Sequence, residues 1–241
     1  MGVYVVSDRG NLRPNNEDSV FAPVPGTPLA LVCDGMGGHK AGEVASALAV
    51  ESISKQAQRR GGREISVKTA TAWVKRANLA LFDAAQADED RRGMGTTATM
   101  LYFSQSSAML AHVGDSRAYR LRGGELVRLT QDHSLVAELV RMGEITEEQA
   151  REHPYRNVIT RALGSDPDIE VDARDLDRLP GDLYLLCSDG LTGYLPDEEL
   201  KTILLEDGSL EEKGQKLLQI ALDRGGRDNI SLVLTDGEVG A

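Results

Sequence analysis

Short apolar runs recur along the chain, bounded by Gly, Pro, Asp or Asn, and this pattern predicts β-strands. The clearest runs are 3–7, 29–33, 97–103, 108–113, 117–121, 125–129, 183–187 and 230–234. The dipeptide Gly123-Gly124 separates two of these runs and indicates a tight hairpin.

Helical periodicity appears in three segments, at about 42–59, 66–87 and 210–224. Ser66 is placed to cap the second of these helices at its N-terminus. The polar segment 143–172 contains short helical pieces broken by two prolines, and we interpret it as a mobile excursion from the main body.

The order of these elements points to an α+β fold. Strands come first, then two consecutive helices, then many strands, so the strict alternation of a doubly wound parallel sheet is absent. Antiparallel sheets covered by helices fit this order better. No linker or low-complexity tract divides residues 1–241, so we expect a single domain.

Composition narrows the possible functions. The chain has 241 residues, of which 41% are hydrophobic and 27% charged, as in ordinary globular proteins. Its net charge of −11 is opposite to that of a nucleic-acid binder or a basic membrane-surface binder. No apolar run reaches the ~18 residues of a membrane span. Cys33 and Cys187 each end an apolar run, so we expect buried, reduced thiols and a cytoplasmic protein.

Several familiar sites are excluded. The glycine-rich segment 35–40 has a lysine at its sixth position and leads into consecutive helices, unlike a dinucleotide-binding loop. A cysteine phosphatase needs an arginine six residues after its cysteine, but His39 and Gly193 stand there. The four histidines lack the paired spacing of zinc or di-iron sites.

Aspartates stand where predicted strands begin or end. Asp18 precedes one strand and Asp34 follows the next, so a hairpin would bring both to one edge. Asp189 and Asp228 share an edge if their strands are antiparallel neighbours, and Asp115 closes a further strand.

Clustered carboxylates repel one another unless cations intervene. Oxygen ligands favour Mg or Mn over zinc or copper, and the carbonyl of Gly35 could join them. A single Asp-Gly after a strand is most often a plain turn. The hypothesis of a metal site therefore depends on several aspartates together.

Seven motifs in order resemble the bacterial branch of the metal-dependent serine/threonine protein phosphatases of type 2C. One such motif would be weak evidence, but the ordered set covers nearly the whole chain. The motifs are Arg13 to Asp18, Val32 to His39, Gly93 to Thr97, Val113 to Arg117, Thr130 to His133, Cys187 to Leu191 and Gly226 to Asn229.

The resemblance implies a four-layer αββα arrangement, a central sandwich of two antiparallel sheets flanked by helices, with 143–172 as a flap. It implies Asp34 bridging two Mn²⁺ or Mg²⁺ ions, with the Gly35 carbonyl on one ion and Asp189 and Asp228 on the other. A third, weaker ion would use Asp115 and Asp189.

Glu17 and Asp18 resemble the family residues that act largely through metal-bound water. By this resemblance, two ions activate a water that attacks phosphorus without a covalent intermediate. Arg13 would bind the phosphoryl oxygens through hydrogen bonds from its guanidinium group. His39 is either the general acid or a structural residue near a helix start, and both alternatives stay open because Met36 stands where the eukaryotic pattern has histidine.

Three functions compete. The first is a phosphatase of phosphorylated proteins that opposes bacterial serine/threonine kinases, expected to work as a monomer. The second is a partner-switching relative that acts on one phosphorylated anti-sigma antagonist, but no sensor domain accompanies this chain. The third, a non-catalytic phosphoprotein binder, is disfavoured because every expected metal aspartate is present.

Overall fold

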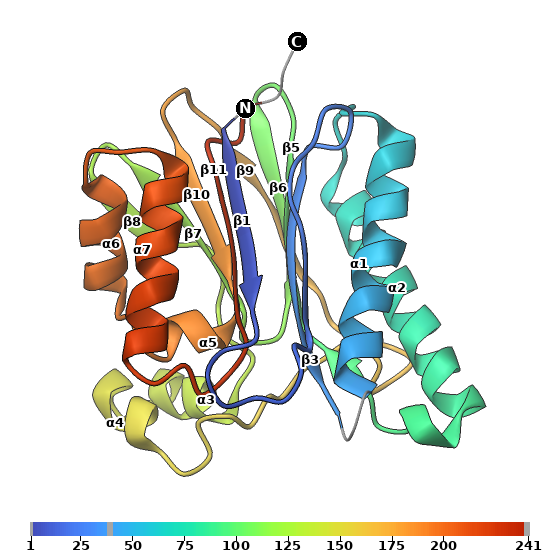
Figure 1. Cartoon of the computed structure of the whole chain (residues 1–241). Helices are drawn as coiled ribbons and strands as arrows, with labels where there is room; N and C mark the ends of the chain where they lie inside the picture. Colours follow the sequence, from blue (N-terminus) through green and yellow to red (C-terminus); the bar gives the residue numbers. More distant parts are fainter. Residues whose placement is uncertain (1, 38–40, 239–241) are drawn as a thin grey trace.

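Two antiparallel sheets stack face to face in the computed structural model, which describes residues 2–37 and 41–238 (Figure 1). The first sheet has the strand order β1 (Val3–Asp8), β11 (Ile230–Thr235), β10 (Leu183–Cys187), β7 (Arg117–Arg122) and β8 (Glu125–Arg128). The second has the order β2 (Asp18–Phe21), β3 (Leu29–Met36), β5 (Ala98–Phe103), β6 (Ser107–Val113) and β9 (Asp172–Asp177), with β4 (Gly95–Thr96) paired to β3.

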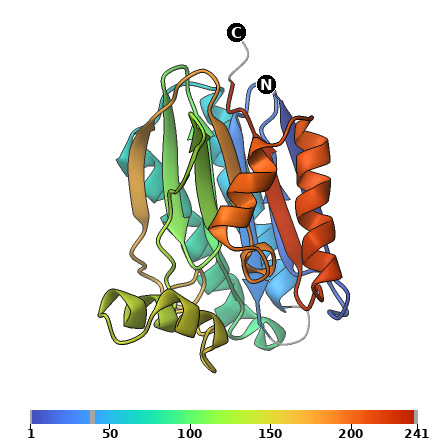
Figure 2. The same ribbon diagram turned by 90° about the vertical axis from the view of Figure 1, so that its left-hand side faces the viewer.

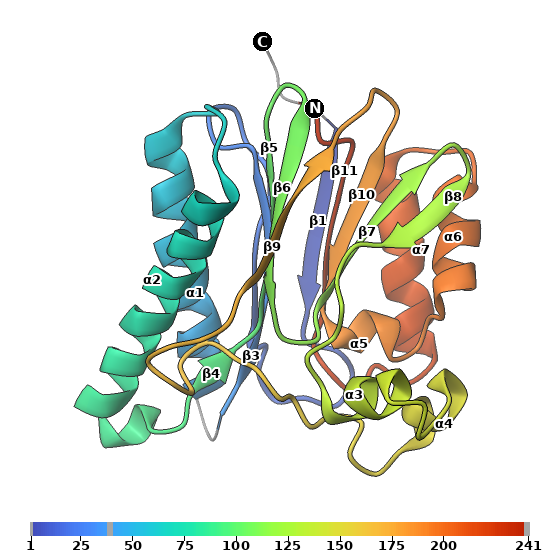
Figure 3. The same ribbon diagram turned by 180° about the vertical axis from the view of Figure 1, so that it is seen from behind.

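Helices cover both outer faces of this sandwich, as Figure 1 and the reverse view in Figure 3 show. The second sheet carries α1 (Ala41–Arg60) and α2 (Val67–Ala87), followed by the short 3₁₀ helix η1 (Glu89–Arg91). The first sheet carries α5 (Asp189–Thr192), α6 (Asp197–Leu205) and α7 (Leu210–Asp223). The predicted α+β sandwich with outer helices is confirmed.

Three hydrophobic clusters hold these layers together. One lies between the α1 and α2 pair and its sheet, and includes Trp73 and Leu81. A second joins the other sheet to α6 and α7, and a third, with Phe103 and Tyr184, fills the space between the sheets. Close packing of this kind keeps strand ends in fixed positions.

The segment between β8 and β9 contains α3 (Leu135–Arg141) and α4 (Glu147–Glu152), which lie together at one end of the sandwich (Figure 2). The predicted excursion 143–172 therefore includes α4 and ends where β9 begins. In the described part of the chain, no helix is long and apolar enough to cross a membrane.

Candidate metal centre

Asp18 and Asp34 lie directly opposite each other on neighbouring strands. In the antiparallel pair β2 and β3, the register joins Asp18 to Asp34. The strand β3 continues three residues beyond the predicted end at Cys33, and its last two residues, Gly35 and Met36, pair with β4. Both carboxylates therefore start from rigid, hydrogen-bonded backbone.

Hydroxyl groups fix the backbone of Asp34 on both sides. Its N–H donates to Thr97 Oγ1 (2.9 Å), and its carbonyl accepts from Thr96 Oγ1 (2.8 Å) and from the N–H of Thr97 (2.9 Å). The Thr97 hydroxyl is bonded in turn to the Ser116 hydroxyl (2.7 Å), one residue after Asp115. This chain of contacts ties the Asp34 strand to the Asp115 loop.

Asp18 is buried, and the described residues bond only one of its carboxylate oxygens. Ser188 Oγ donates to Oδ2 (2.9 Å), whereas Oδ1 has no hydrogen-bond partner among residues 2–37 and 41–238. Burial, together with the charges of Asp189 and Asp228, raises the pKa of Asp18 to about 7, despite opposing hydrogen bonds from serine hydroxyls.

Asp189 and Asp115 approach from two other strands. Asp189 follows β10 and opens α5, and burial together with Asp228 raises its pKa to about 6. Asp115 follows β6, and its buried Oδ1 also lacks a hydrogen-bond partner in the described part of the chain. Burial, and then the charge of Asp189, raises the pKa of Asp115 well above its ordinary value.

Asp34 lies at the electrostatic centre of this group. Burial raises its pKa well above the ordinary value, and the charges of the other four aspartates raise it further. We call Asp18, Asp34, Asp115, Asp189 and Asp228 the aspartate cluster. The strands predicted to share edges do bring these residues together.

The chemistry of the cluster fits hard divalent cations. Its donors are carboxylate oxygens, which Mg²⁺ and Mn²⁺ prefer, and two of these buried oxygens have no hydrogen-bond partner among the described residues. Within residues 2–37 and 41–238, no three His, Cys, Asp or Glu side chains are already arranged around one common point. The carboxylates would therefore have to turn toward a shared ion.

Gly35 is required here by close packing. A Cβ at this position would lie 2.2 Å from the carbonyl oxygen of Gly42 and 2.4 Å from that of Glu17. Such distances exclude any side chain unless the backbone moves. The glycine thus lets α1 begin directly beside the Asp34 strand.

Arg13 lies at the edge of the aspartate cluster. Its Nη2 donates to Asp228 Oδ2 (2.8 Å), and its side chain is 47% exposed. Asn229 secures the loop that carries Arg13, since its Nδ2 donates to the carbonyls of Arg9 and Asn15 and its Oδ1 accepts from the N–H of Glu17 (2.8 Å).

Sequence reasoning overlooked the roles of Ser188 and Asn229. Ser188 precedes Asp189 and Asn229 follows Asp228 within the motifs given above. Their position beside candidate metal ligands could have indicated these roles. His39, the candidate general acid, lies outside the described residues. His133, which ends the motif from Thr130, accepts the N–H of Gly114 at Nδ1 (3.0 Å) and contacts Asp172 through Nε2 (3.2 Å).

Comparison with known proteins agrees with this geometry. The family profile described as protein phosphatase 2C matches residues 13–234. A serine/threonine phosphatase Stp of Listeria monocytogenes is 39% identical over 239 residues, which cover 97% of this chain and 94% of that protein. The phosphatase PstP of Mycobacterium tuberculosis is 42% identical over 232 residues, which cover 95% of this chain and 44% of that protein.

Solved structures give the same result. The crystal structure of the Mycobacterium tuberculosis serine/threonine phosphatase PstP/Ppp has a TM-score of 0.89 and 39% identity, with 96% of each chain covered. A structure of the PstP catalytic domain in complex with two manganese ions has a TM-score of 0.87 and 38% identity, again with 96% of each chain covered. On the strength of its sequence, fold and aspartate cluster, this chain belongs to the protein phosphatase 2C family.

Proposed function

We propose that this chain removes phosphate from phosphoserine and phosphothreonine side chains of proteins, and that it thereby opposes serine/threonine kinases. The observation that carries the proposal is the aspartate cluster, five buried or partly buried carboxylates whose only ion pair in the described part of the chain is that of Asp228 with Arg13. Such a group is costly to bury unless cations occupy it.

The aspartates divide into roles in this proposal. Asp34 would bridge two divalent ions, with the Gly35 carbonyl on one ion and Asp189 and Asp228 on the other. Asp115 and Asp189 would hold a third, weaker ion. Asp18 would act through water, which agrees with its buried Oδ1 having no hydrogen-bond partner among the described residues.

Mn²⁺ and Mg²⁺ are both suitable for these oxygen ligands. The two manganese ions named for the PstP catalytic domain support Mn²⁺ here. When bound, the ions supply an acidified water and neutralise charge on the phosphoryl group.

Arg13 would orient the substrate. A planar guanidinium can donate two parallel hydrogen bonds to phosphoryl oxygens. In the described part of the chain only its Nη2 has a hydrogen-bond partner, Asp228, so the other donors can face the substrate. The half-exposed position of Arg13 at the edge of the aspartate cluster supports this role.

Neither cysteine is suited to be a nucleophile. Cys33 and Cys187 are fully buried, and burial raises the pKa of both thiols. A reactive cysteine instead needs a lowered pKa and access to substrate. This difference supports direct attack by water, without a covalent phosphoenzyme. The proton for the leaving oxygen would come from His39 if that residue is the general acid; the structural alternative for His39 stays open.

Phosphate release from a phosphothreonine peptide tests the proposal. We expect release by the wild-type protein with Mn²⁺, and its loss on addition of a chelator or in the variant Asp34→Ala. The matched control Asp175→Ala changes an exposed aspartate on β9 and should retain activity. Activity that survives Asp34→Ala, or that ignores the chelator, contradicts the mechanism.

The third ion has its own test. Asp115→Ala should lower turnover while two ions stay bound, as counted by metal analysis after gel filtration. Loss of all metal from Asp115→Ala would contradict the assignment. The same gel filtration reports the oligomeric state, for which we propose a monomer.

A further inference from the structure

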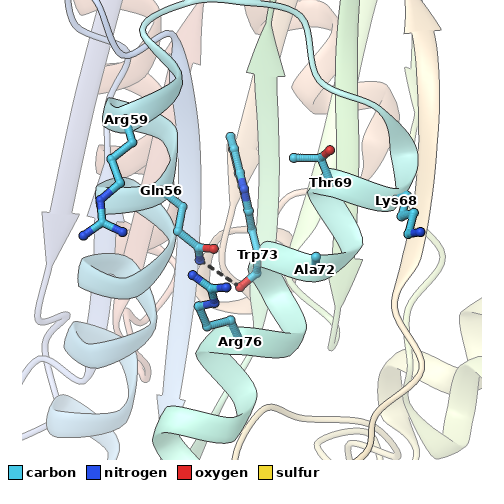
Figure 4. A pocket seen from close by; sticks show the side chains of 7 residues that line it. All are labelled: Gln56, Arg59, Lys68, Thr69, Ala72, Trp73 and Arg76. Atoms are coloured by element: carbon cyan, nitrogen blue, oxygen red, sulfur yellow. Dashed lines mark hydrogen bonds between the residues drawn. The ribbon is translucent and has the colours of Figure 1, made fainter.

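A second charged region lies between α1 and α2, on the outer helical layer. It is a pocket of about 430 Å³ (Figure 4). Its lining includes Gln56 and Arg59 from α1 and Lys68, Thr69, Trp73 and Arg76 from α2. We call this pocket the interhelical groove.

The charge of the interhelical groove is opposite to that of the whole protein. Residues 41–87 contain seven Lys or Arg and four Asp or Glu, whereas the full chain contains 27 and 38. Two other cations of this layer are neutralised locally, Lys55 by Glu51 and Lys75 by Asp168.

The three cations of the groove have no such neighbours. Across the described ranges, Arg59, Lys68 and Arg76 make no ion pair with a carboxylate. All three are exposed. Their positive charge is therefore available to an anionic partner.

The inner wall of the interhelical groove is rigid and apolar. Trp73 is only 6% exposed, and its ring packs edge-on against Tyr102 with 5.4 Å between centroids. The Gln56 amide donates to the Trp73 carbonyl (3.3 Å) and so joins the two helices (Figure 4). An apolar surface edged by cations suits a ligand that is itself apolar and acidic.

We propose that the interhelical groove docks an acidic segment of a protein substrate, with an apolar side chain against Trp73 and carboxylates facing Arg59, Lys68 and Arg76. Charge complementarity argues for an acidic occupant. That the acidic segment belongs to a substrate rests on the proposed function, because a phosphatase of proteins meets partners large enough to reach both regions.

The position of the groove determines where the acidic segment must lie in the substrate. Helix α1 begins against Gly35, next to the aspartate cluster, and Gln56 and Arg59 come 14 and 17 residues after Gly42. At about 1.5 Å per residue, the groove is roughly 20–25 Å along the helix from the aspartates. Even a fully extended chain needs at least about seven residues to cover this distance.

A tethered peptide tests this arrangement. The probe is a phosphothreonine peptide joined by a Gly/Ser linker of about 30 residues, long enough to reach the groove, to a segment of Asp and Glu around one Leu. In the control probe, Asn and Gln replace Asp and Glu. We expect the acidic probe to have a KM about tenfold lower than that of the control probe at low salt, with the difference shrinking as salt rises.

Charge reversal locates the effect. The variant R59E/K68E/R76E should abolish the KM difference but leave hydrolysis of p-nitrophenyl phosphate unchanged. The matched variant K201E/K213E/K216E, which makes the same charge change on α6 and α7, should keep the KM difference. Equal losses in both variants, or no loss in the first, would overturn the proposal. So would an undiminished KM difference with a linker of four residues, because such a linker is too short to reach the groove.

Binding without turnover separates this proposal from the proposed function. Fluorescence anisotropy of the labelled acidic segment, without phosphothreonine, should show binding to the wild-type protein that is at least about tenfold weaker in R59E/K68E/R76E. An acidic segment that fails to bind an active enzyme overturns docking alone. Displacement by inorganic phosphate at constant ionic strength would indicate a small-anion site and would also overturn it.

Discussion

Strand β10 is flanked by an aspartate at each end, the buried Asp182 and the partly buried Asp189, and their surroundings differ. Asp182 precedes the strand, and its carboxylate accepts from Arg122 Nε (2.6 Å) and Nη2 (2.7 Å), from the Leu179 N–H (2.9 Å) and from the Tyr184 hydroxyl (3.0 Å). Asp189 follows the strand and lies beside the carboxylates of Asp228 and Asp34, and it makes no ion pair with an arginine or lysine of the described residues.

The pKa values of the two aspartates shift in opposite directions. Burial alone would raise the pKa of Asp182, but hydrogen bonds from Arg122 and its other partners outweigh burial, and the pKa falls. The pKa of Asp189 rises to about 6 because burial is reinforced by Asp228. A buried carboxylate with all its partners stabilises the fold, whereas one left among like charges indicates a site for cations.

The largest effect on stability is expected at Asp182, whose carboxylate has all its hydrogen-bond partners. Asp182→Asn removes one of the two carboxylates that pair with Arg122, and because Arg122 is 27% exposed and keeps Asp177, the free energy of unfolding should fall by about 2 kcal/mol, less than for a fully buried ion pair. Urea denaturation measures this change. Mn²⁺ affinity should stay within about twofold of wild type; a large loss of affinity would show that the two ends are not independent.

The stabilisation of the fold by Mn²⁺ bound at the aspartate cluster should depend on pH. The pKa of Asp18 is about 7 and that of Asp189 about 6 in the metal-free fold, against about 3.9 in the unfolded chain. The metal-free fold therefore binds more protons than the unfolded chain, and these carboxylates make it less stable as pH rises from about 4 to 7.

Bound Mn²⁺ requires the same carboxylates to be ionised, so its stabilising effect should grow as pH rises and level off above about pH 7. Each displaced proton contributes about 1.4 kcal/mol per pH unit. Thermal unfolding at pH 5.5, 6.5 and 7.5, with and without Mn²⁺, measures the difference. The buried His112, whose pKa is lowered to about 4, contributes in both states and cancels. A stabilisation independent of pH would refute the assignment of these carboxylates.

Asp34→Asn should stabilise the metal-free protein even though it removes activity. The substitution keeps the shape of the side chain but removes one of five mutually repelling carboxylates, and we expect a gain on the order of 1 kcal/mol at pH 7.5. Chemical denaturation in the presence of a chelator tests the sign. A destabilised variant would mean that the Asp34 carboxylate serves the fold instead of a cation.

The smallest effect is expected from Ser188→Ala. Ser188 Oγ donates to Asp18 and accepts the N–H of Ser231 (3.0 Å), so its loss should reposition Asp18 without removing it. We expect turnover to fall about threefold to tenfold, corresponding to one hydrogen bond of about 1 kcal/mol. A Mn²⁺ titration of activity should shift to higher concentration, and Ser188→Thr should restore part of the loss. An unchanged titration would assign Ser188 to the fold alone.

Much of the fold followed from simple patterns. The hairpin about Gly123-Gly124 is present, with Arg122 paired to Glu125 and positive φ at both glycines. The apolar strands 29–33, 183–187 and 230–234 place their aspartates at common edges as expected. These successes depend on strong local signals, namely apolar runs and glycine turns.

Other elements carry weaker signals. Strand β9 reads Asp-Ala-Arg-Asp-Leu-Asp and forms because β6 pairs with it, and no apolar run predicts it. Helix α6 was not predicted because it is too short to show a clear helical period. Pro196 and the three acidic residues of its first turn are typical of a helix start and were the available signal. Ser188 and Asn229 act through long-range hydrogen bonds, which only the folded chain brings together.

A calorimetric titration of the metal-free protein with Mn²⁺ tests the central claim most directly, because it counts ions without depending on any substrate. If the aspartate cluster is a cation site, the wild-type protein takes up at least two ions with proton release at pH 7, Asp182→Asn does the same, and Asp34→Asn loses both. Equal uptake of Mn²⁺ by Asp34→Asn and the wild-type protein would contradict the account.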